Sequence, residues 1–175
     1  MTAPPDLVAP VVAFRSWRLA RGRLMSPFIP CTWQGRVMHA ACYDANRTLT
    51  RSVGWLDEPH DSPHEACQCG IYAYHTPGPR SWFGEAYWCE GVVSAWGRLV
   101  VHLDGFRAEH ARVEAVAVPD GLERVGAEQV HRAAAALAIP VIPHDELEAF
   151  AAALGGGVPA SLRPQSASLR SSSTM

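Results

Sequence analysis

Three side chains suited to metal binding or nucleophilic chemistry lie close together in the sequence: His64, Cys67 and Cys69. Thiolate sulfur and imidazole nitrogen are ligands that zinc prefers, and a structural zinc site needs four such groups at tetrahedral corners. Cys42 can supply the fourth if the strand that carries it folds beside the strand that follows Cys69. The sequence therefore predicts a zinc site formed by Cys42, His64, Cys67 and Cys69.

The Cys-x-Cys spacing leaves two other interpretations open. A turn at Gln68, which Gly70 permits, is needed to aim both sulfurs at one point. Without that turn the cysteines act as small buried hydrophobic residues. In the third interpretation a thiol with a lowered pKa is a nucleophile beside a histidine base. The candidate nucleophiles and bases are Cys67 and Cys69, with His64, His75 and His102.

A second group of polar residues follows a predicted strand. The dipeptide Asp104-Gly105 predicts a tight turn, which would bring His102 close to the segment after it. If that segment is extended, Arg107 and Glu109 share one face of it. We expect them either to bind a ligand or to form an ion pair at a solvated sheet edge. The predicted ligand-binding residues are Trp96, His102, Arg107 and Glu109.

The first part of the chain is predicted to form antiparallel β-structure. Residues 11–19 are rich in Val, Phe and Trp, and the Arg-Gly-Arg turn at 21–23 predicts a hairpin with the segment from Leu24. Further strands are expected at 36–43, 69–74 and 92–103, with a bulge at Gly97. Loops are expected at 46–63 and at the aromatic-rich 77–91.

Strand and helix patterns alternate beyond residue 112. A strand at 113–118, a helix at 122–137 and a strand at 139–142 permit a crossover onto a parallel pair. A second helix is expected to begin near Asp145, capped by Asp145 and Glu148, and to end at Gly155. The predicted fold class is α+β: a mainly antiparallel β-sheet body followed by a strand-helix-strand-helix segment.

Length and composition indicate one domain, over 11–154. We expect a disordered leader at 1–10 and a disordered Gly/Ser-rich tail at 155–175. All fifteen basic residues are arginine, but the net charge of −2 gives no overall field that would attract nucleic acid. Five unevenly spaced cysteines, together with no apparent export signal or membrane-spanning run, predict a cytoplasmic protein with reduced thiols.

Four segments carry a resemblance to other proteins: Phe-Arg-Ser-Trp-Arg-Leu at 14–19, Cys-Gln-Cys-Gly-Ile-Tyr-Ala at 67–73, Trp-Gly-Arg-Leu-Val-Val-His at 96–102 and Gly-Phe-Arg-Ala-Glu-His-Ala at 105–111. The chain resembles a family of small, uncharacterised bacterial proteins of actinobacterial type. This resemblance implies that residues 11–118 form one domain. It implies no activity, cofactor or ligand.

These observations favour a non-enzymatic binding or regulatory module, with a structural zinc ion as its candidate cofactor and an unknown protein or small molecule as its ligand. A recognisable set of catalytic residues is absent. A hydrolase that depends on the cysteines and histidines, or on zinc, is the alternative from another class. Sequence-specific binding of nucleic acid through the arginines at positions 15–23 is a second alternative.

Overall fold

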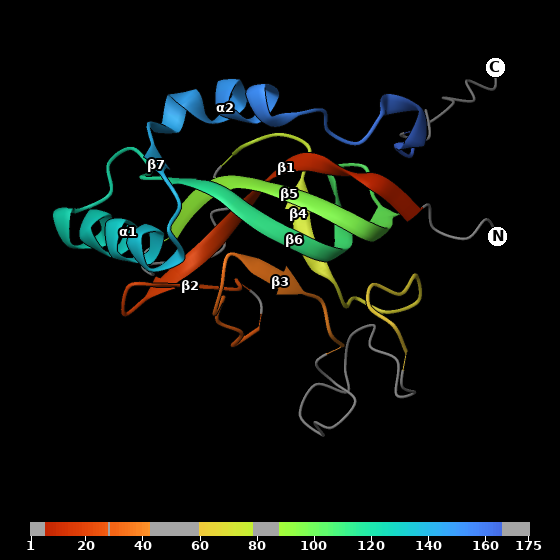
Figure 1. Ribbon diagram of the computed structural model, residues 1–175, viewed down its shortest axis with the longest axis horizontal. Coiled ribbons are helices and arrows are strands. Elements are labelled where there is room, and N and C mark those ends of the chain that lie inside the picture. The colour runs from red at the N-terminus through yellow and green to blue at the C-terminus, as the bar shows by residue number, and fades with distance from the viewer. Residues whose placement is uncertain (1–5, 28, 43–59, 79–87, 166–175) are drawn as a thin grey trace, which may run out of the picture.

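Four strands pair in a closed ring in the computed structural model, which describes residues 6–27, 29–42, 60–78 and 88–165 (Figure 1). The strands are β1 (Asp6–Ala20), β4 (Ile71–Tyr74), β5 (Trp88–Val101) and β6 (Gly105–Ala117). β1 pairs with β5, β5 with β6 and β6 with β4, and β4 returns to β1 where Phe14 faces Tyr74. All four pairings are antiparallel, which confirms the predicted antiparallel body.

Three short strands extend the sheet. β2 (Arg23–Met25) forms the predicted hairpin with β1, through a turn in which Arg21 and Gly22 have φ angles of 53° and 68°. β3 (Val37–His39) and β7 (Val141–Ile142) line the edge of β6 beyond β4. Because β7 runs parallel to β6 and follows a helix, the expected crossover is also confirmed.

The two α-helices cover different parts of the sheet (Figure 1). α1 (Arg124–Leu137) places Val130, Ala133 and Ala134 in the main core, beside Trp17 and Phe106. α2 (Leu147–Leu154) lies over a second, smaller core that contains Val12 and Phe14, because successive β1 side chains point to opposite faces. Two short 3₁₀ helices, η1 (His144–Glu146) and η2 (Ala160–Leu162), flank α2.

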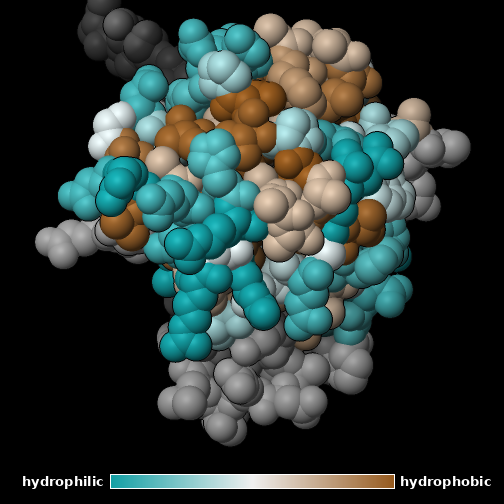
Figure 2. Space-filling model, turned by 60° about the vertical axis from the view of Figure 1, so that its left-hand side comes forward, coloured by the Kyte–Doolittle hydropathy of each residue, from teal (hydrophilic) through white to brown (hydrophobic). Residues whose placement is uncertain are grey.

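The outer face of α2 is apolar. The helix buries Leu147 and Ala151 and exposes Ala149, Ala153 and Leu154. Figure 2 shows hydrophobic residues gathered at the top of the molecule, where this helix lies. In the part of the chain that the structure describes, no helix has the length and apolar character that crossing a membrane requires.

A buried arginine ties β1 to β4. The Arg15 guanidinium donates to the Tyr72 carbonyl oxygen and to Ser26 Oγ at 3.3 Å. It also lies 5.8 Å from the ring centre of Trp17 and 5.5 Å from that of Trp33, within the range of cation–π attraction. Burial lowers the pKa of Arg15 to about 10, so the side chain still carries its charge at neutral pH.

Two strands are longer than the sequence predicts. β5 begins at Trp88, within the expected loop, and β6 runs unbroken through the segment expected to hold a separate strand at 113–118. Gly91, the last residue of the expected loop, lies in β5, where its lack of a side chain lets β6 approach closely. The predicted bulge at Gly97 is confirmed, because its φ is 78° and the β5–β6 register shifts between Trp96 and Leu99.

The second helix also differs from its prediction at the start. Pro143 precedes the 3₁₀ helix η1, so α2 begins only at Leu147, with Glu146 at its N-cap position and no side-chain cap. The expected capping box of Asp145 and Glu148 is therefore absent. The expected end of the helix at Gly155 is confirmed.

The ordered chain extends past both expected limits of the domain. Residues 6–10 belong to β1 rather than to a leader. Beyond residue 154, the Val12 amide donates to the Gly156 carbonyl at 2.9 Å, and Val158 is 1% exposed. This hydrogen bond and the buried Val158 attach residues 155–165 to the sheet. Residues 46–59 of the expected loop at 46–63, residues 79–87 of the expected loop at 77–91, and the ends 1–5 and 166–175 lie outside the described residues.

We expect Gly91→Ala to destabilise the fold by about 1–3 kcal/mol, as overpacking does. A Cβ atom at Gly91 would lie 2.2 Å from the Ala115 carbonyl oxygen and 3.1 Å from the Trp17 ring. Urea denaturation measures the change. Gly156→Ala is the control, because its Cβ would meet no atom within 4 Å. Equal stability of the two variants would contradict the close approach.

Candidate metal centre

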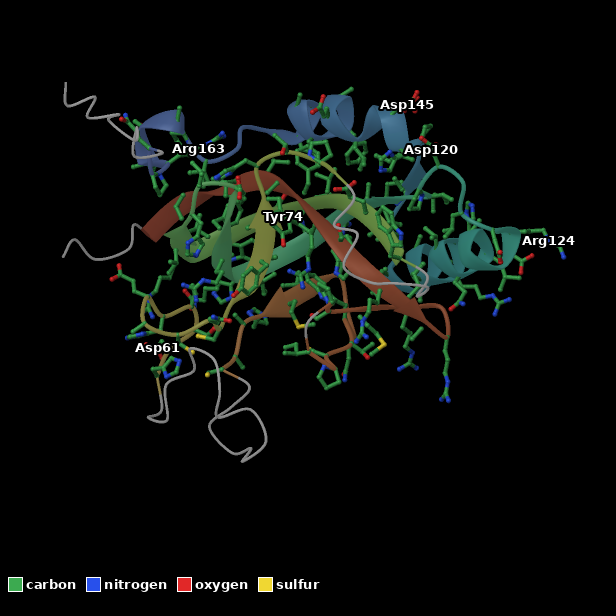
Figure 3. All side chains as sticks on the ribbon, turned by 180° about the vertical axis from the view of Figure 1, so that it is seen from behind. Asp61, Tyr74, Asp120, Arg124, Asp145 and Arg163 are labelled. Atoms are coloured by element: carbon green, nitrogen blue, oxygen red, sulfur yellow. The ribbon has the colours of Figure 1, made fainter. Side chains whose placement is uncertain are left out.

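Three thiols and one imidazole converge at one end of the molecule. The ligand atoms of Cys42, His60, Cys67 and Cys69 all lie within 4.8 Å of one another. Figure 3 shows sulfur atoms near the labelled Asp61, which follows His60 in the chain. Cys67 and Cys69 are buried, and Cys42 and His60 are partly buried. The donor set is of the Cys₃His type found in structural zinc sites.

The spacing of the ligand atoms suits a tetrahedral metal. Zn–S bonds of about 2.3 Å and Zn–N bonds of about 2.0–2.1 Å give tetrahedral edges of about 3.8 Å between two sulfurs and about 3.5 Å between sulfur and nitrogen. The Sγ atoms of Cys42 and Cys67 are 3.8 Å apart, and Cys69 Sγ lies 3.4 Å from His60 Nε2. Two edges of the cluster therefore already have the lengths that zinc requires.

The edge of β6 brings the distant Cys42 to the other two thiols. β4 and β3 pair with adjacent stretches of this edge, rather than with each other. The Ala40 amide continues the pairing beyond β3 by donating to the Glu109 carbonyl at 2.7 Å. Cys42 follows β3, and Cys69 precedes β4, so the chain segments on either side of this junction meet at the cluster.

A tight turn aims Cys67 and Cys69 at the same point. The Cys67 amide donates to the His64 carbonyl at 3.1 Å, and Gly70 has a φ of 125°. A Cβ at Gly70 would lie 2.9 Å from Arg107 Cβ and 3.0 Å from Pro63 Cβ. Glycine is therefore required for both conformation and space. The hydrogen-bonded turn thus lies at His64–Cys67 rather than at Gln68, where the predicted zinc site needed one.

Arg107 holds this turn from the side of β6. Its buried guanidinium donates to the carbonyl oxygens of Cys67, Cys69 (3.0 Å) and His64 (3.3 Å). Three thiolates outweigh the charge of Zn²⁺ by one negative charge, so the nearby guanidinium would balance a loaded centre. Arg107 therefore holds the loop at 64–69, called the ligand loop below, and would compensate the charge of a metal bound there.

The same arginine sets the protonation of His102. Arg107 Nε donates to His102 Nε2 at 3.1 Å, and because arginine can only donate, this nitrogen must be unprotonated. Burial, and then the charge of Arg107, lower the pKa of His102. The ring is therefore neutral at pH 7.

The histidine of the cluster is not the one predicted from the sequence. His60, rather than His64, brings its ring into the cluster. His64 Nδ1 accepts a hydrogen bond from the Ala66 amide at 3.2 Å, and its ring centre lies 5.1 Å from that of His60. His64 thus shapes the turn. His60 and His64 lie close together in the sequence, and His60 belongs to a segment expected to be an exposed loop. The local pattern does not show which of the two histidines the turn brings to the thiols.

The predicted ligand-binding residues divide into two groups. His102 contacts Arg107, as described above. Glu109 instead accepts from the Arg98 amide at 3.0 Å and lies 3.3 Å from the His110 ring, where Trp96 also packs. Arg107 points to the ligand loop, so the expected Arg107–Glu109 ion pair is not among the ion pairs of the described residues.

An open groove of about 660 Å³ borders the ligand loop. Its walls include Glu65 and Gln68 of the loop, Tyr72 and Tyr74 of β4, and His102. The Tyr72 hydroxyl donates to the Gln68 carbonyl at 2.9 Å, so the loop and the strand are joined across it. The shape of this groove depends on how the ligand loop is held.

Burial keeps two of the thiols, Cys69 and Cys89, from being activated as nucleophiles. Burial raises the pKa of the Cys69 thiol, although His60 lies beside it. Burial also raises the pKa of Cys89, which is 0% exposed within β5. A thiol with a raised pKa is mostly protonated at neutral pH and therefore a weak nucleophile.

Comparison with protein-family models, curated proteins and solved structures finds no match for this chain. The arrangement of the residues therefore carries the functional argument.

We expect Arg107→Lys to lower the free energy of unfolding by at least about 2 kcal/mol. Lysine keeps the charge but cannot reach three carbonyl oxygens and His102 at once, which leaves buried polar groups without partners. Urea denaturation of metal-loaded protein measures this. Arg124→Lys is the control, because the Arg124 side chain is 90% exposed and the change should be within about 0.5 kcal/mol. Equal effects would show that Arg107 does not hold the loop.

Proposed function

We propose that this protein is a non-enzymatic binding module built around a structural zinc ion held by Cys42, His60, Cys67 and Cys69. The observation that carries the proposal is the convergence of these four ligand atoms within 4.8 Å, with two of their separations at the edge lengths of a zinc tetrahedron. Zinc suits three thiolates and an imidazole better than magnesium or calcium, which prefer oxygen ligands.

The proposed role of the metal is structural because the protein fills the tetrahedron. A catalytic zinc keeps one position for water or substrate, whereas four protein ligands leave none. Two of the four ligands belong to the turn held by Arg107, and Cys42 comes from the segment after β3. Metal binding would therefore join segments far apart in the sequence and stabilise the fold.

The groove beside the ligand loop is the proposed binding surface. It combines aromatic and polar side chains in an open depression, the character of many ligand sites. Because the loop with Cys67 forms one of its walls, zinc would keep the groove in shape. We propose a small molecule or a protein segment as its occupant.

We expect one zinc ion per chain in protein purified without chelator, as measured by elemental analysis. His60→Gln should weaken zinc binding about tenfold or more in a competition titration, since it removes a ligand. His64→Gln is the matched control and should bind as the unaltered chain does, because His64 contacts only the turn. Loss of zinc in His64→Gln with retention in His60→Gln would contradict this ligand set.

A count of reactive thiols tests the same centre without mutation. Cys31, which is partly exposed and outside the cluster, should react with a thiol reagent in the native protein. Cys42, Cys67 and Cys69 should react with this reagent far more slowly until a chelator is added, because zinc holds them as bound thiolates. A folded protein that contains no zinc, and whose thiol reactivity a chelator leaves unchanged, would overturn the proposal.

A further inference from the structure

Two short contacts lie within the cluster of four ligands. Cys42 and Cys67 have their sulfurs 3.8 Å apart, although 25 positions separate them in the sequence. Cys69 instead lies against His60, at 3.4 Å. The five cysteines of the chain are all in the thiol form.

We propose that Cys42 and Cys67 are a site of reversible disulfide formation, and that oxidation of this pair by a peroxide expels the metal. The inference rests on the proposed zinc centre and adds its regulation. A disulfide has an S–S bond of about 2.05 Å, so the two sulfurs must approach by roughly 1.8 Å. Cys42 follows β3, a three-residue strand, and so has little regular structure holding it in place.

The exposure of the thiols sets the order of reaction. Cys42 is partly exposed, whereas Cys67 and Cys69 are each 2% exposed, so peroxide reaches Cys42 first. Its thiolate attacks one peroxide oxygen, the O–O bond breaks, and a sulfenic acid and hydroxide form. The Cys67 thiolate then attacks the sulfenic sulfur, the S–S bond forms and the S–O bond breaks, releasing a second hydroxide.

The electron balance of this reaction is complete. Two thiolates give up two electrons in forming the disulfide, and one peroxide takes them. Two protons convert the two hydroxides to water. A dithiol reductant reverses the reaction by thiol–disulfide exchange.

The packing disfavours the other pairings. Arg107 holds the carbonyl oxygens of both Cys67 and Cys69, which fixes the backbone between these two thiols. Cys89 is 0% exposed within β5, and Cys31 lies outside the cluster. The Cys42–Cys67 link, whose sulfurs are already 3.8 Å apart and come from two separate segments, is therefore the pairing we propose.

Oxidation would remove half of the metal ligands. A zinc ion left with only Cys69 and His60 has two ligands instead of four, and such a site does not retain it. The ligand loop would then lose its tie to the segment after β3. Since this loop forms a wall of the groove, the disulfide would change the binding surface.

The experiment treats the zinc-loaded full chain with hydrogen peroxide and follows zinc release with a metal-sensitive dye. Peptide mapping by mass spectrometry locates the disulfide. We expect release of one zinc ion per chain, a Cys42–Cys67 link, and recovery of zinc binding after treatment with a dithiol reductant. Cys31→Ser is the matched control and should behave in the same way, whereas Cys42→Ser should form no intramolecular link to Cys67.

The possible failures are distinguishable. A chain that holds zinc but forms a Cys67–Cys69 link, or no link, overturns this inference and leaves the zinc centre standing. A chain that never holds zinc yet forms the Cys42–Cys67 link supports the disulfide, but it overturns both the expulsion of metal and the proposed function.

Discussion

The hydrogen bonds of one buried guanidinium support both the sheet and the candidate metal centre. Arg107 stands on β6 beside β4 and donates to three carbonyl oxygens of the turn that carries Cys67 and Cys69. A turn buried against a sheet needs hydrogen-bond donors for its backbone carbonyls, because a buried carbonyl without a donor lowers the stability of the fold. Arginine, with five donors in a planar fork, meets several of them at once, and its charge opposes that of the thiolates.

The closed ring depends on β4, the shortest of its four strands. β4 has only four residues and meets β1 at a single residue pair, Phe14 with Tyr74. Two buried arginines hold this strand and the loop before it from opposite sides, since Arg15 reaches Tyr72 from β1 and Arg107 reaches Cys69 from β6. The proposed zinc would add a tie between the loop before β4 and the segment after β3. The two arginines thus have a structural role that lysine could not fill, because an ammonium group cannot make the several planar hydrogen bonds of a guanidinium.

The candidate metal centre, the turn and the groove share residues. Cys67 belongs to the proposed centre and to the wall of the groove, so any change in its bonding reaches the binding surface. The segment that leads to Cys42 follows the three-residue strand β3 at the edge of β6, whereas Arg107 holds the loop that carries the other two thiols. A stable sheet with one adjustable ligand segment suits a module whose ligand binding responds to metal or to oxidants.

The sequence by itself determined the antiparallel body, the N-terminal hairpin, the helix of α1 with its crossover, and the bulge at Gly97, because local patterning and turn residues encode these features. It also pointed to three of the four clustered ligands, since sulfur and imidazole chemistry is visible in residue types. Only the tertiary structure decided between His60 and His64, because the choice depends on the direction of a turn. Likewise, the burial of Arg107 under that turn and the placing of Cys42 beside Cys67 depend on strands that meet along β6, and contacts between distant segments leave no local signal.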